Sequence, residues 1–72
     1  MERVVVTLPE NTIAPTRMVA EVMIRKGFDV VGNEGNLELI VTQKPGGKPL
    51  EEYFTDGIVE DMRSDGITIK AF

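Results

Sequence analysis

Hydrophobic residues recur along this 72-residue chain at two different spacings, and the order of these spacings limits the fold more than any other feature. Apolar residues alternate with others, as in β-strands, in segments 3–8, 28–31, 37–42 and 67–72. Two longer segments, 13–26 and 50–65, favour helices. This β-α-β-β-α-β order predicts the α+β class. We expect one ferredoxin-like domain, residues 1–72, whose four-stranded antiparallel sheet carries both helices on one face.

Residues with special backbone preferences mark where these elements end. Gly27 follows the first helical segment and Gly66 the second, and each is suited to the left-handed conformation that ends a helix. Residues 32–36, which contain two glycines and two asparagines, favour a hairpin turn between the second and third strands. The second helix is predicted to be continuous, with Gly57 at its middle costing about 1 kcal/mol relative to alanine.

The composition removes most of the residues that enzymes and metal sites use. The chain has no cysteine, histidine or tryptophan, which excludes thiolate nucleophiles, Ser-His pairs and ordinary zinc sites. Asp56 with Glu60, and Asp61 with Asp65, are spaced to share a helix face, but a hard cation needs more oxygen ligands than such a pair supplies. We therefore expect a protein that is not an enzyme and has no cofactor or metal. Cation binding by this acidic face remains the alternative.

Charge and hydrophobicity also limit the kinds of partner. A net charge of −4 disfavours nucleic acids and anionic membranes, and the predicted central strands lack the aromatic residues on which RNA-recognition motifs stack bases. No run of residues approaches the ~20 apolar positions of a membrane-spanning helix. The sequence thus predicts a cytoplasmic protein that binds neither nucleic acid nor membranes.

The segment VTQKPGGKPL, residues 41–50, has the strand, glycine loop and helix order of a nucleotide-binding loop. It lacks the G-x-x-x-x-G-K-[ST] spacing, and Pro49 removes an N–H where a phosphate site uses one. We interpret the segment as a crossover loop. Weak anion binding by Lys44 and Lys48 is the alternative.

The sheet face away from the helices is the most informative surface that the sequence predicts. If Val4 and Leu39 face the helices, strand alternation turns Val5, Val31 and Ile40 to the other face. An apolar centre with a charged rim is typical of a protein interface. The alternative is that β-branched residues here reflect strand propensity alone. The predicted interface residues are Val5, Val31, Ile40, Arg3, Glu38 and Phe72.

The first helix is apolar around most of its circumference, since only Arg17, Glu21 and Arg25 form a polar stripe. One sheet face cannot bury that much apolar surface. The second helix must cover a flank of the first, or a second chain must do so.

These patterns favour a non-catalytic protein-interaction or regulatory module that self-associates as a homodimer through the open sheet face. The expected partner is a second copy of the chain or, failing that, another protein. The alternative is a small-metabolite-binding sensor, by analogy with ACT domains, which share this order of elements and bind ligands near the loop after the first strand. In this chain that loop is LPENTIAP, where Pro9, Asn11 and Thr12 are the candidate ligand-binding residues.

Overall fold

The computed structural model describes residues 1–10, 13–33 and 37–72. Within these residues the chain forms four strands and three helical segments. In chain order they are β1 (Arg3–Thr7), α1 (Ile13–Arg25), β2 (Phe28–Asn33), β3 (Glu38–Gln43), α2 (Leu50–Tyr53), α3 (Asp56–Ser64) and β4 (Thr68–Ala71).

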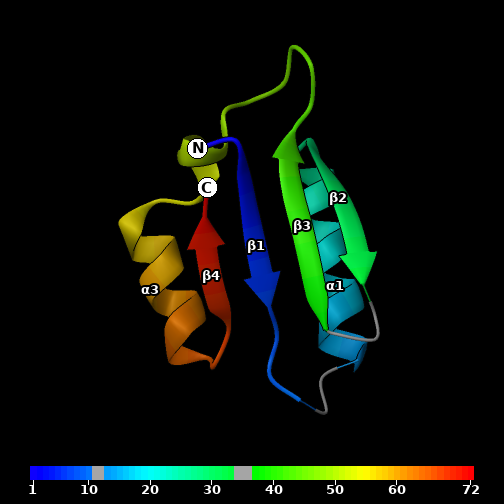
Figure 1. Cartoon of the computed structure of the whole chain (residues 1–72), viewed down its shortest axis with the longest axis vertical. Helices are drawn as coiled ribbons and strands as arrows, with labels where there is room; N and C mark the ends of the chain where they lie inside the picture. Colours follow the sequence, from blue (N-terminus) through cyan, green and yellow to red (C-terminus); the bar gives the residue numbers. More distant parts are fainter. Residues whose placement is uncertain (11–12, 34–36) are drawn as a thin grey trace.

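The four strands form one antiparallel sheet in the order β2-β3-β1-β4, so β1 and β3 are central. Helix α1 packs on β2 and β3, and α3 packs beside β4 (Figure 1). The predicted ferredoxin-like α+β arrangement is confirmed. Within the described residues, no helix lies over the other face of the sheet (Figure 1).

Most predicted ends of elements agree with the structure. Gly27 and Gly66 have φ values of 93° and 84°, and their amides donate to the carbonyls of Ile24 and Arg63, which end α1 and α3. Strand β2 continues through Asn33, two residues beyond the predicted strand, and β4 is shorter than predicted. Of the turn predicted at 32–36, residues 32 and 33 belong to β2, and residues 34–36, like residues 11–12 before α1, lie outside the described residues.

The prediction of one continuous second helix is wrong, because the helix is broken after Tyr53. The Phe54 amide still donates to the Leu50 carbonyl, but Phe54 itself leaves helical geometry at φ −83° and ψ 64°. Thr55 is extended, and its hydroxyl accepts a hydrogen bond from the Ile58 amide at 3.3 Å, so it starts α3 as an N-cap. Gly57 consequently lies in the first turn of α3, not in the middle of a helix.

Removing this cap is expected to weaken α3. Thr55→Ala should lower the free energy of unfolding by about 1 kcal/mol, because the Ile58 amide loses its side-chain acceptor. Thr55→Ser, which keeps the hydroxyl, should change it much less. Urea denaturation followed by circular dichroism measures both, and equal effects of the two substitutions would contradict the assigned cap.

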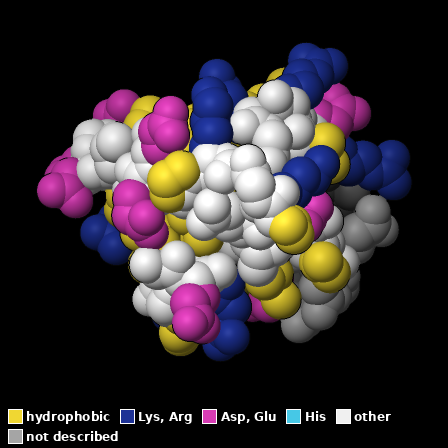
Figure 2. All heavy atoms as spheres, turned by 90° about the horizontal axis from the view of Figure 1, so that it is seen from above, with side chains coloured by type: hydrophobic (Ala, Val, Ile, Leu, Met, Phe, Trp, Pro, Cys, Tyr) yellow, Lys and Arg dark blue, Asp and Glu magenta, His cyan; other side chains and the backbone are white. Residues whose placement is uncertain are grey.

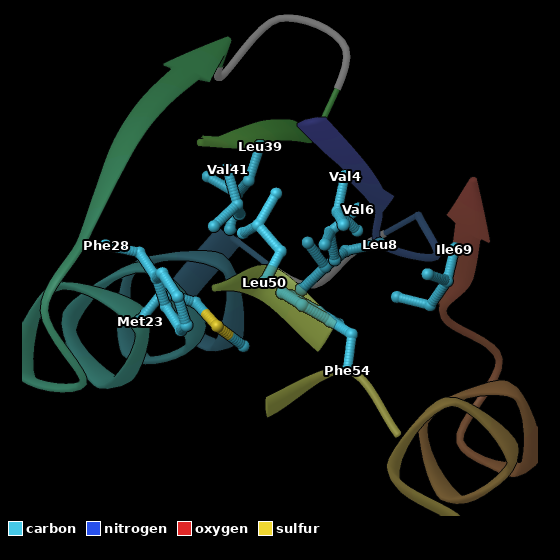
Figure 3. Packing of buried hydrophobic residues seen from close by; sticks show 10 residues of the cluster. All are labelled: Val4, Val6, Leu8, Met23, Phe28, Leu39, Val41, Leu50, Phe54 and Ile69. Carbon is cyan, nitrogen blue, oxygen red and sulfur yellow. The ribbon is translucent and has the colours of Figure 1, made fainter. Parts of the chain in front are cut away.

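The core lies between the sheet and the helices (Figure 3). Inward side chains of the strands supply one side, and the strand parity predicted from the sequence is confirmed. Leu50 lies between the side chains of β1 and those of β3, and the ring of Phe54 lies next to Leu50 (Figure 3). The buried apolar residues are Val4, Val6, Leu8, Met23, Phe28, Leu39, Val41, Leu50, Phe54 and Ile69.

Candidate functional site

Three apolar side chains form a stripe across the open face of the sheet. The strand registers pair Val31 with Ile40 and Ile40 with Val5, so the three lie side by side on β2, β3 and β1. Val31 is 65% exposed, whereas Val5 and Ile40 are partly covered by their neighbours. Directly opposed side chains in a sheet have Cβ atoms about 5 Å apart, so the stripe is continuous.

A row of larger and more polar side chains runs beside this apolar stripe. Asp29 pairs with Thr42 on β3, Thr42 pairs with Arg3 on β1, and the Phe72 amide donates to the Arg3 carbonyl at 2.9 Å. The Arg3 guanidinium lies 4.6 Å from the centre of the Phe72 ring, a cation–π contact. Phe72 remains 55% exposed, which adds apolar area at the edge of the open face.

Charges on the open face are divided between its two halves. The carboxylates, Asp29 and Glu38, lie on β2 and β3, whereas the cations, Arg3 and Lys70, lie on β1 and β4. Opposite charges on two halves of one face can pair with the same face of a second copy. The structure therefore places all six predicted interface residues on or beside one surface. Whether that surface binds a partner stays a prediction.

The glycine loop closes on itself. The Gly47 amide donates to the Lys44 carbonyl at 2.8 Å, and Gln43 Nε2 donates to the Gly47 carbonyl at 2.9 Å. A Cβ atom on Gly47 would lie only 3.1 Å from the Lys44 carbonyl oxygen, so the turn itself accounts for a glycine there. Lys48 Nζ lies 4.0 Å from Glu52 Oε1. These contacts support the interpretation as a crossover loop.

The remaining sequence-predicted sites are only partly described. Pro9 lies beside Gly66, whereas Asn11 and Thr12 are outside the described residues, so the ligand-binding prediction at that loop stays untested. Within residues 1–10, 13–33 and 37–72, no three acidic side chains are grouped to hold a metal ion. In the same residues no helix has the length and apolar character needed to cross a membrane.

The end of the molecule that carries both termini and the glycine loop shows side chains of both charge signs (Figures 1 and 2). Here the Met1 amino group lies 3.0 Å from Glu51 Oε1, and this hydrogen bond lowers the pKa of the Glu51 carboxyl.

No family model, curated protein or solved structure matches the chain. We therefore infer function from the surfaces themselves.

Proposed function

We propose that this domain is a non-catalytic interaction or regulatory module of the cytoplasm that forms a homodimer through the open face of its sheet. The observation that carries the proposal is the apolar stripe of Val31, Ile40 and Val5. An apolar centre surrounded by charged groups of both signs is the anatomy of a specific interface.

The division of charge selects one arrangement of two copies. Consider a two-fold axis parallel to the strands and passing over Ile40. It sets Ile40 against its own copy, Val31 against Val5 of the partner, and Asp29 against Arg3 of the partner, because the registers put each pair in one row. The Ile40 contact lies on the axis and occurs once, whereas the Val31–Val5 and Asp29–Arg3 pairs each occur twice. The two sheets would pack about 10 Å apart with their strands within about 30° of each other.

The size of the face sets the expected affinity. In this arrangement only β2, β3 and β1 overlap, and three strands ~4.8 Å apart and about five residues long span only about 14 by 17 Å, which is small for a stable interface. We therefore expect a reversible dimer with a dissociation constant in the micromolar range. The association must be measured from about 1 μM to 1 mM to see both species.

Sedimentation equilibrium of matched glutamate variants tests the proposal. Ile40→Glu places a carboxylate at the centre of the stripe and should give a folded monomer at all concentrations, because the charge would be buried without a partner. Ile24→Glu is the control, since it makes the same chemical change on α1, where Ile24 is 52% exposed. Circular dichroism checks that both variants fold.

We expect the wild type and Ile24→Glu to dimerise equally. A wild type that is monomeric throughout the range contradicts self-association. A dimer that Ile24→Glu disrupts and Ile40→Glu leaves intact places the interface on the helical side instead.

A further inference from the structure

An apolar groove runs between the helices on the other side of the sheet. Its lining residues are Met18, Val19, Val22, Met23, Tyr53 and Met62, and the open space between them has a volume of about 280 Å³. Helix α1 packs on β2 and β3 and α3 packs on β4, so the two helices have few direct contacts and the space between them stays open. Met18 and Val22 remain 65% and 41% exposed. Tyr53 of α2 and Met62 of α3 therefore cover the flank of α1 only in part, so the expectation that the second helix covers it is met incompletely.

A second cavity, of about 190 Å³, adjoins this groove beyond Tyr53, whose side chain lines both spaces. Its other lining residues are Lys26, Phe28, Lys48 and Glu52. Two ammonium groups and one carboxylate give the cavity a net charge of +1. Phe28 and Tyr53 supply its aromatic wall, with ring centres 6.2 Å apart. The groove thus has an apolar part and a cationic end.

We propose that the groove and its cationic end bind a small amphiphile with a short aliphatic chain and one carboxylate. The chain would lie along α1 and the carboxylate between Lys26 and Lys48. A flexible chain suits a lining with three methionines, because methionine adapts to irregular shapes. The combined space falls at the lower end of the ~300 to 1,000 Å³ range of ligand sites, which favours a short chain.

The charge at the cationic end selects the headgroup. A net charge of +1 matches a monoanionic carboxylate better than a dianionic phosphate. Lysine ammonium groups are point charges and do not require the planar, two-point contact that arginine makes. Glu52 already lies 4.0 Å from Lys48, so a carboxylate ligand would share that ammonium group and take Lys26 as its second partner.

This site lies on the helical side of the sheet, opposite the proposed dimer face, so the two proposals are independent. It also lies at the end of α1 near Gly27, away from the loop after β1 that the sequence suggested for a ligand (Figure 1).

Titration of the ¹⁵N-labelled protein with three small molecules, followed by amide chemical shifts, tests the proposal. Octanoate has both the chain and the charge, octan-1-ol keeps the chain, and acetate keeps the charge. We expect octanoate to saturate with a dissociation constant near about 1 mM, with shifts at Met18, Val22, Lys26, Tyr53 and Met62. Octanol should bind more weakly, and acetate should produce no saturable change.

Variants separate the two parts of the site. The double change Lys26→Gln with Lys48→Gln should weaken octanoate binding about tenfold and leave octanol binding unchanged, because it removes two charge pairs and no apolar surface. Lys44→Gln is the matched control, since Lys44 is an exposed lysine that does not line the cavity. Val22→Glu should abolish binding by placing a carboxylate in the groove, whereas Ile24→Glu should not.

Several outcomes would overturn the inference. One is the absence of saturable shifts at millimolar octanoate. Another is equal affinity for octanoate and octanol with no effect of the lysine changes, which would show a merely apolar surface. Shifts confined to Val5, Val31 and Ile40 would place binding on the open sheet face. Repeating the titration with Ile40→Glu keeps the result separate from the oligomeric state.

Discussion

Leu50→Ala is expected to lower the free energy of unfolding by about 2 to 5 kcal/mol, the range for removing a large aliphatic side chain from a core. Leu50 is only 1% exposed and lies between the side chains of β1 and β3 (Figure 3). A domain of 72 residues has a total stability of roughly 4 to 11 kcal/mol, so this one change should remove a large share of it. Urea denaturation followed by circular dichroism measures the loss.

Two control variants show whether the lost volume is responsible. Leu50→Met nearly conserves volume and should cost less than about 1.5 kcal/mol. Ile24→Ala removes a comparable side chain from an exposed position of α1 and should cost less than about 1 kcal/mol. A Leu50→Ala variant as stable as Ile24→Ala would mean that α2 does not pack into the core in solution.

Exchanging charges on the open sheet face is expected to break the dimer and then restore it. Asp29→Arg alone sets two arginines against each other across the proposed two-fold axis, and Arg3→Asp alone sets two aspartates against each other. Each should weaken association by at least about tenfold, because each substitution acts twice in a symmetric dimer. The variant with both changes should regain most of the affinity in sedimentation equilibrium.

Within one chain, β3 separates Asp29 from Arg3 by about 10 Å, so the two side chains do not pair with each other. An affinity restored in the variant with both changes must therefore come from contacts with the partner. Lys70→Asp is the matched control: β4 lies outside the overlap of the two sheets, and association should change little. Glu38 faces its own copy near the axis, so Glu38→Gln should strengthen association. A double exchange as weak as the single ones would contradict this two-fold arrangement while leaving the sheet face as the interface.

The sheet was predictable because alternation along each strand determines which face a residue occupies. Val4, Leu39 and Val41 are buried as predicted, and Ile40 lies between Val5 and Val31 on the open face. Once the order of elements is known, this topology places the first and third strands at the centre.

The break between α2 and α3 was hidden by a coincidence of spacing. Leu50, Phe54, Ile58 and Met62 recur every fourth residue, as they would on one helix, although only the first two belong to the buried core. The local signal for the break is Thr55, a good N-cap residue followed by an acidic residue in the first turn of α3.

The lysine cavity was not predictable from local pattern. Lys26 and Lys48 are far apart in sequence and reach one cavity only because α1 ends beside the segment that precedes α2. Sequence reasoning paired Lys48 with Lys44 because they flank the same glycines, but Lys44 does not line that cavity. A pairing of this kind depends on how elements pack, which residue spacing does not encode.

Both central strands are apolar on both faces at their middles, and this affects how the chain finds its correct alignment during folding. If β3 slipped by one residue, Ile40 would take the place of Leu39 and Val41 in the core, so one buried aliphatic side chain would replace two. The same slip would bury Glu38 and Thr42 without partners, which is costly. The polar residues that flank Ile40 therefore fix the register of β3. Replacing Glu38 with leucine would remove the larger of these two costs and bring the slipped alignment closer in energy to the native one.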